Sequence, residues 1–172
     1  MYAIKNSPTI VIPKWFLMLD KLGLGHRMMP WDVSTQWNST YDMLLFALKY
    51  QHTLNVITED HEMKLCQYEM DDEEWGIAKE LCDVLEVFKD ATLFFSRDGT
   101  PNIATVIPVI DCIDETLATS ASNSQYSVSI QAALAMGKRT LNRYYSKTDY
   151  SEVYRIAMGE HIILSLYSTV LI

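Results

Sequence analysis

The chain has 172 residues, which is enough for one domain with a sizeable core. Hydrophobic residues make up 49% and charged residues 21%, as in ordinary globular proteins. The net charge of −8 argues against a nucleic-acid binder that relies on overall attraction to phosphate, but it leaves room for a local DNA contact.

The first helix is expected to begin at Pro13, because proline suits a first helical turn. Trp15, Leu19 and Leu22 share one face of this helix, and Gly23 and Gly25 should end it. Residues 1–13 are expected to be irregular or extended, with residues 9–12 forming a short edge strand or covering the core.

A second helix is predicted from about Ser39 to about Val56, after a loop over residues 26–37. Ser39 and Asp42 have the spacing of a capping box, in which two side chains bind free amides of the first turn. Trp37 should therefore lie just before the helix. A large aromatic residue in this position either fills the joint between loop and helix or faces outward to stack on a partner.

The second half of the sequence predicts further helices. Residues 59–70 should form a connection with one or two helical turns. Four acids at positions 71–74 then open the longest helix, over residues 72–96, where they offset its positive N-terminal end. Helices over 103–119 and 126–145 follow, and a short one runs from 148 to about 158. The predicted fold is therefore all-α, an irregular multi-helix bundle of about six to seven helices in a single domain over residues 1–172.

Motifs for catalysis and metal binding are missing from the sequence. It has no phosphate-binding glycine loop, no catalytic serine elbow and no zinc-protease motif. Cys66, Cys82 and Cys112 are widely spaced, which favours buried thiols over disulfides or a zinc site. We therefore expect no catalytic residue, no metal site, no cofactor and no small-molecule substrate. With no secretory signal and no apolar run of about 18 residues, we expect an intracellular protein without a membrane span.

Three cations, Lys138, Arg139 and Arg143, are expected on the outer side of the 126–145 helix. They form either a solvated face or a contact with DNA phosphates, which arginine binds well.

Residues 159–172 are expected to form an apolar tail, because the sequence stays apolar to its last residue. This tail either packs back into the bundle or follows from a shortened chain, through a frameshift or a splicing error.

Residues 32–44 read Asp-Val-Ser-Thr-Gln-Trp-Asn-Ser-Thr-Tyr-Asp-Met-Leu. They closely resemble the D-V-x-T-R-W-N-S-T-x-x-M-L signature of hAT-superfamily transposases. Weaker likeness follows in the same order at residues 72–75, 88–92, 105–108, 144–145 and 154–158. The resemblance thus covers about residues 14–158 and is strongest at the tryptophan motif.

The resemblance implies a helical insertion from a ribonuclease H-like transposase. In that family the insertion carries a tryptophan that stacks near the transposon end, so Trp37 is the stacking candidate, with Gln36, Asn38 and Ser39 beside it. The family's three metal-binding acids would lie before Met1 and after Ile172. Magnesium or manganese is expected only for a complete family member, and the resemblance implies a nuclear protein.

Two departures from the family pattern limit the expected function. Gln36 replaces the arginine of the signature, which removes a cation beside DNA. The tail after residue 158 does not follow the family. We therefore expect a truncated hAT-like transposase fragment that is catalytically incompetent alone and retains a DNA contact. The alternative is a helical module that pairs with a second copy of itself or with other transposase-like chains.

The first prediction concerns activity. We expect the purified chain to show no strand transfer and no nuclease activity, because the family's catalytic acids lie outside the resembling stretch. The check is incubation with hAT-type transposon-end DNA in magnesium or manganese. Metal-dependent cleavage would overturn the prediction.

Overall fold

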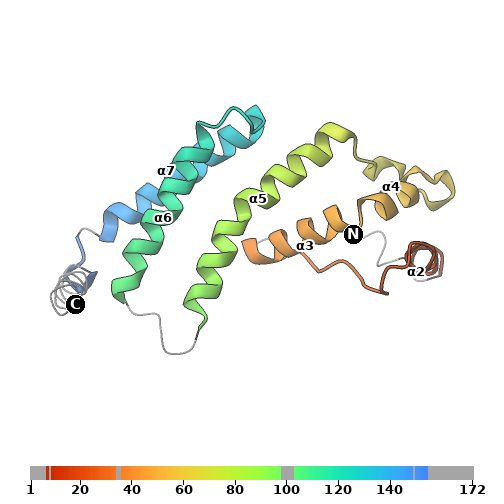
Figure 1. The fold of residues 1–172 in the computed structure, drawn as a ribbon, viewed down its shortest axis with the longest axis horizontal. Helices are drawn as coiled ribbons and strands as arrows, with labels where there is room; N and C mark the ends of the chain where they lie inside the picture. Colours follow the sequence, from red (N-terminus) through yellow and green to blue (C-terminus); the bar gives the residue numbers. More distant parts are fainter. Residues whose placement is uncertain (1–6, 8, 34–35, 98–102, 149, 155–172) are drawn as a thin grey trace, which may run out of the picture. The chain divides into compact units, whose positions relative to one another are not determined.

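The computed structural model describes residues 7, 9–33, 36–97, 103–148 and 150–154 (Figure 1). All the regular elements of these residues are helices, so the predicted all-α, multi-helix class is confirmed. They are α2 (Val11–Lys21), α3 (Trp37–Lys49), α4 (Gln51–Glu59), the short 3₁₀ helices η1 (His61–Met63) and η2 (Cys66–Tyr68), α5 (Asp72–Phe95), α6 (Ile103–Ala121) and α7 (Val128–Thr148).

The chain divides into two compact units, Met1–Leu85 and Glu86–Ile172. The first contains α2 to α4, the two 3₁₀ helices and the start of α5, and the second contains the end of α5 with α6 and α7. The expectation of a single domain stays a prediction. No helix among the described residues has the length and apolar character needed to cross a bilayer.

Helix α2 begins at Val11, so the alternative of an edge strand over residues 9–12 is wrong. Pro13 fits as the third helical residue, because an amide there has no partner within the helix. The predicted end is confirmed. Gly23 has a φ of +65°, which glycine adopts without strain, and the Leu24 amide donates to the Leu19 carbonyl at 2.8 Å.

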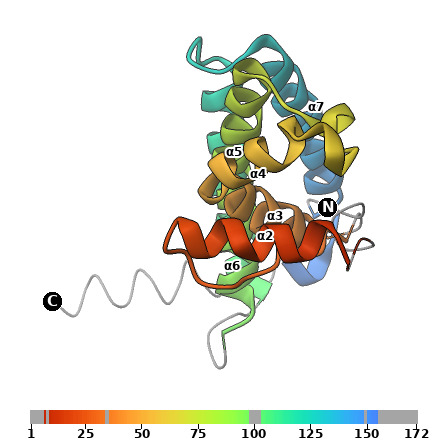
Figure 2. The same ribbon diagram turned by 90° about the vertical axis from the view of Figure 1, so that its right-hand side faces the viewer.

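The core of the first unit is built around α2, which lies across α3 and α4 (Figure 2). Trp15 is its centre, with its ring 6.2 Å from Phe46 and 5.9 Å from Tyr50, between centroids. The buried members of this core are Val11, Trp15, Leu19, Tyr50, Leu54, Ile57, Leu65 and Trp75.

The predicted helix over 39–56 is two helices, since α3 and α4 meet at Tyr50 with φ −107° and ψ 19°. The Tyr50 ring is 4% exposed and stacks on Phe46 at 4.1 Å between centroids. The break places Phe46 from α3 and Ile57 from α4 at the same core. Burial of these side chains explains why the backbone leaves the helical path there.

The connection after α4 forms two 3₁₀ turns, as predicted. The acidic start of α5 is also confirmed, and it contains a capping box that sequence analysis did not assign. The Asp71 carboxylate accepts from the Glu74 amide at 2.8 Å, and the Glu74 carboxylate accepts from the Asp71 amide at 3.1 Å. Trp75 follows directly and donates its indole N–H to Asn55 Oδ1 at 3.0 Å, which joins α5 to α4.

In the second unit, α6 and α7 pack side by side as a helical hairpin. Ile113 and Leu117 of α6 are buried, as are Ile130 and Leu134 of α7. Pro108 lies inside α6 on its exposed side and does not end the helix. The predicted short helix over 148–158 is seen as a helical turn at residues 152–154, and its remainder and the 159–172 tail lie outside the described residues.

Candidate nucleic-acid interface

The motif segment before α3 is tied to the first turn of that helix. Asp32 Oδ1 accepts from the Thr40 hydroxyl at 2.7 Å. Ser39 Oγ accepts from the Val33 amide at 2.8 Å, and its shortest contact to an acceptor is the Gln36 carbonyl at 2.7 Å. These side chains thus fix the path of the chain on both sides of Ser34 and Thr35, whose structure is not described.

The predicted capping role of Ser39 is wrong. Helix α3 begins at Trp37, two residues earlier than expected, and Gln36 occupies the capping position without a side-chain capping bond. Ser39 is therefore the third helical residue, and its hydroxyl binds the preceding loop. A sequence pattern cannot distinguish these two uses of a serine hydroxyl, because both place it within one turn of a helix start.

Trp37 is the first residue of α3 and its side chain is 55% exposed. Trp31, in the same loop region, is 49% exposed, whereas Trp15 and Trp75 are 2% and 6% exposed. A ring that fills the joint between loop and helix would be buried like the latter two. The outward-facing alternative is therefore the one that the geometry supports.

The other candidates around Trp37 differ in accessibility. Gln36 is exposed, while Asn38 and Ser39 are partly buried. Asn38 Oδ1 is buried without a hydrogen-bond partner among the described residues. Of the four motif candidates, Gln36 and Trp37 are thus the two whose side chains a ligand can reach readily.

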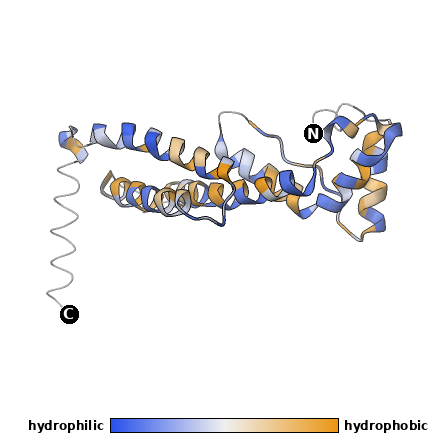
Figure 3. Cartoon of the chain, turned by 90° about the horizontal axis from the view of Figure 1, so that it is seen from above, coloured by the Kyte–Doolittle hydropathy of each residue, from blue (hydrophilic) through white to orange (hydrophobic). Residues whose placement is uncertain are grey.

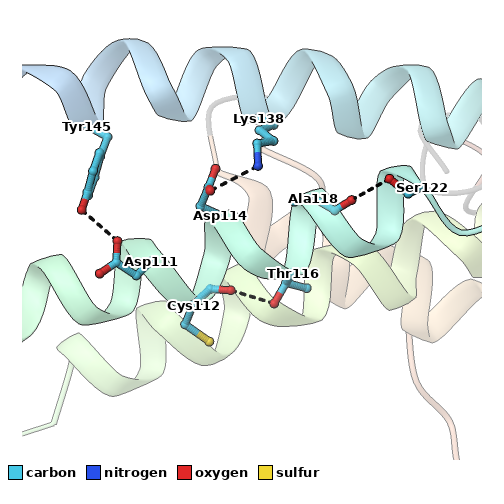
Figure 4. A network of polar contacts seen from close by, with 8 residues as sticks. All are labelled: Asp111, Cys112, Asp114, Thr116, Ala118, Ser122, Lys138 and Tyr145. Atoms are coloured by element: carbon cyan, nitrogen blue, oxygen red, sulfur yellow. Dashed lines mark hydrogen bonds and ion pairs between the residues drawn. The ribbon is translucent and has the colours of Figure 1, made fainter.

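The cationic strip on α7, predicted to consist of Lys138, Arg139 and Arg143, has a different composition in the structure. Lys138 was expected on the outer face, but its Nζ contacts Asp114 Oδ2 of α6 at 3.2 Å (Figure 4). Further along the same side, Tyr145 donates its hydroxyl to Asp111 Oδ1 at 2.8 Å. Neighbouring helical residues point about 100° apart, so Lys138 and Arg139 cannot share one face.

Arg139 and Arg143 are exposed, as predicted. Two further residues of this surface, Tyr144 and Lys147, were not predicted. The Tyr144 ring lies 5.5 Å from the Arg143 guanidinium carbon and 5.2 Å from Lys147 Nζ. Arg139, Arg143 and Lys147 are each four residues apart, about one helical turn, and this spacing in the sequence could have predicted that Lys147 belongs to the strip. The motif loop belongs to the first unit and this strip to the second.

Cysteine placement agrees with the prediction only in part. Cys82 is buried, Cys66 is partly buried and Cys112 is exposed, and all three are free thiols. Cys66 Sγ lies 3.4 Å from His61 Nδ1. Among the described residues, no group of three or more His, Cys, Asp or Glu side chains is placed to hold a metal ion.

Comparison with protein-family models gives a match in the first half of the chain. Residues 10–84 match the family model described as the ZBED1 RNase-like helical domain. No curated protein and no solved structure matches. The matched stretch lies within the first unit and contains the Trp37 loop. This part of the chain is therefore similar to a helical domain of hAT-related, transposase-like proteins.

Proposed function

We propose that this chain is a helical insertion domain of the hAT transposase type, which contacts a transposon DNA end through Trp37 and cleaves no DNA by itself. The observation that carries the proposal is the exposed Trp37 ring within the stretch that matches the family model. A protein with this role acts in the nucleus. The absence of nuclease activity follows from the family resemblance, which assigns the metal-binding acids to another part of the transposase.

The charge of the matched stretch favours stacking over phosphate binding. Residues 10–84 contain 13 acids and six lysines or arginines. Gln36 adds no cation beside Trp37. Stacking needs only the π-face of an unpaired base, and each stacked base contributes about 1–3 kcal/mol. The preferred ligand is therefore DNA with unpaired or flipped bases, such as a hairpin end, bound with little dependence on salt.

The test is replacement of Trp37. Trp37→Ala should weaken binding of a DNA hairpin with an unpaired loop by about five- to 150-fold, the equivalent of one lost stacking contact. Trp37→Phe should retain most of the affinity, because it keeps an aromatic face. Fluorescence anisotropy of a labelled hairpin measures both effects.

Trp31→Ala is the matched control, because Trp31 is similarly exposed and lies only six residues away. It should leave hairpin affinity within about twofold of the unmodified chain. Equal losses for Trp31→Ala and Trp37→Ala, or no loss for Trp37→Ala, would contradict the stacking role of Trp37.

A second candidate function is pairing with other transposase-like chains. The observation that favours it is the exposure of two large apolar residues of α3, Trp37 at 55% and Leu45 at 50%. Such side chains gain free energy from a protein partner that covers them. Sedimentation that shows only monomer at micromolar concentration would count against this function.

A further inference from the structure

The outer face of α7, turned away from α6, has two chemically different halves. Its exposed N-terminal half is apolar, with Val128 82% and Met136 66% exposed and Ala132 between them. Its exposed C-terminal half is cationic and contains Arg139, Arg143 and Lys147. The residues lie three or four apart and so form one continuous stripe. Figure 3 shows the same change from hydrophobic to hydrophilic residues along α7.

A DNA backbone would fit only part of this stripe. Phosphates would pair with the three cations, but they would make no apolar contact with Val128 and Met136. An amphipathic helix with acids opposite the cations and an apolar residue opposite Met136 covers the cationic half and the apolar residue next to it. Helix α7 contains no Asp or Glu, so two copies of α7 cannot supply these charges to one another.

The exposed side of α5 supplies the matching pattern. Asp83, Glu86 and Asp90 are exposed and lie along one side of the helix, and Leu93, 49% exposed, continues the row. The three acids span about 10 Å along the axis and the three cations of α7 about 12 Å, at 1.5 Å per residue. The acidic row therefore has nearly the length of the cationic row.

We propose that α7 of one molecule packs antiparallel on α5 of a second copy of this chain. In this alignment Asp90 faces Arg139, Glu86 faces Arg143 and Asp83 faces Lys147. Leu93 then faces Met136, whereas a parallel alignment would leave both of these side chains without an apolar partner. The proposal rests on the pairing function above, to which it adds a second copy as the partner and α5 and α7 as surfaces besides α3, and it is independent of the DNA contact.

Each copy offers two contacts to another copy, one through its acidic row on α5 and one through its cationic residues on α7. The net charge of −8 per chain opposes association over long distances. At physiological salt the Debye length is about 8 Å, so this repulsion is screened while close charge pairs persist. The dimer is therefore expected at micromolar concentration in about 0.15 M salt.

The experiment is a charge swap followed by sedimentation equilibrium on the full chain. Arg139→Glu/Arg143→Glu should weaken the dimer by about tenfold or more, because it replaces attraction by like-charge repulsion. Glu86→Lys/Asp90→Lys should do the same. An equimolar mixture of the two variants should recover the unmodified dimer affinity, because both contacts are again between opposite charges.

Lys21→Glu/Arg27→Glu is the control, because it makes the same change in net charge at exposed cations outside both stripes and should leave the dimer affinity unchanged. The α5 variant tests the same contact independently if the α7 variant misfolds, and circular dichroism measures the helix content of both variants. An unmodified chain that stays monomeric overturns both the pairing function and these surfaces. A dimer that persists in both charge variants overturns only the surfaces. Loss of DNA binding in the α7 variant without loss of dimer overturns the proposal in favour of a phosphate contact.

Discussion

Trp15→Ala should lower the free energy of unfolding of the first unit by about 3–5 kcal/mol, as for other buried tryptophans replaced by alanine. The side chain is 2% exposed. It contacts Phe46 of α3 and Tyr50, the residue at which α3 and α4 meet. Its indole N–H donates to the Arg27 carbonyl at 2.8 Å, so the loop after α2 loses its attachment as well.

The measurement is urea unfolding followed by far-ultraviolet circular dichroism. Trp31→Ala removes the same side chain at a position that is 49% exposed, and it should change stability by less than about 1 kcal/mol. A loss at Trp15 no greater than that at Trp31 would show that the described core does not hold the first unit together.

The helices themselves were accessible from sequence because local signals define them. Asp71 and Glu74 open α5 as the acidic pattern predicts, and Gly23 ends α2. The break at Tyr50 was not accessible, because residues 39–56 have a continuous helical pattern. The break follows from burial of Tyr50 against Trp15, which is 35 positions away in sequence. A contact between residues so far apart in the sequence produces no local sequence pattern that could predict it.

The candidate site shows the same limit. Trp37 was predicted just before a helix and is the first residue of that helix, so its position at the helix start was predicted to within two residues. Ser39 was predicted in a capping box and Lys138 on the solvent side, and both predictions are wrong because each side chain binds a group supplied by another segment. For Ser39 that group is the Val33 amide, and for Lys138 it is the Asp114 carboxylate. Sequence spacing gives the face on which a residue lies more reliably than the partner it selects.

Leu117→Ala should destabilise the second unit by about 2–5 kcal/mol, the cost of a large cavity in a helical core. Leu117 is 2% exposed, and the other buried apolar residues in the described parts of α6 and α7 are Ile113, Ile130 and Leu134. Because few buried side chains hold the two helices together, the remaining ones cannot repack to fill the cavity that the substitution leaves. Thermal unfolding followed by circular dichroism measures the effect.

The same variant tests whether the two units unfold together. Helix α5 runs from Asp72 to Phe95 without interruption and passes the boundary between the units at residues 85 and 86. If the second unit unfolded alone, residues 86–95 would have to stay helical without the rest of that unit, and isolated helical segments of that length are marginal in water. We therefore expect Leu117→Ala to shift one cooperative transition of the whole chain. A separate early transition, with hydrogen exchange accelerated in α6 and α7 but unchanged in α2 and α4, would instead show two independently folding domains.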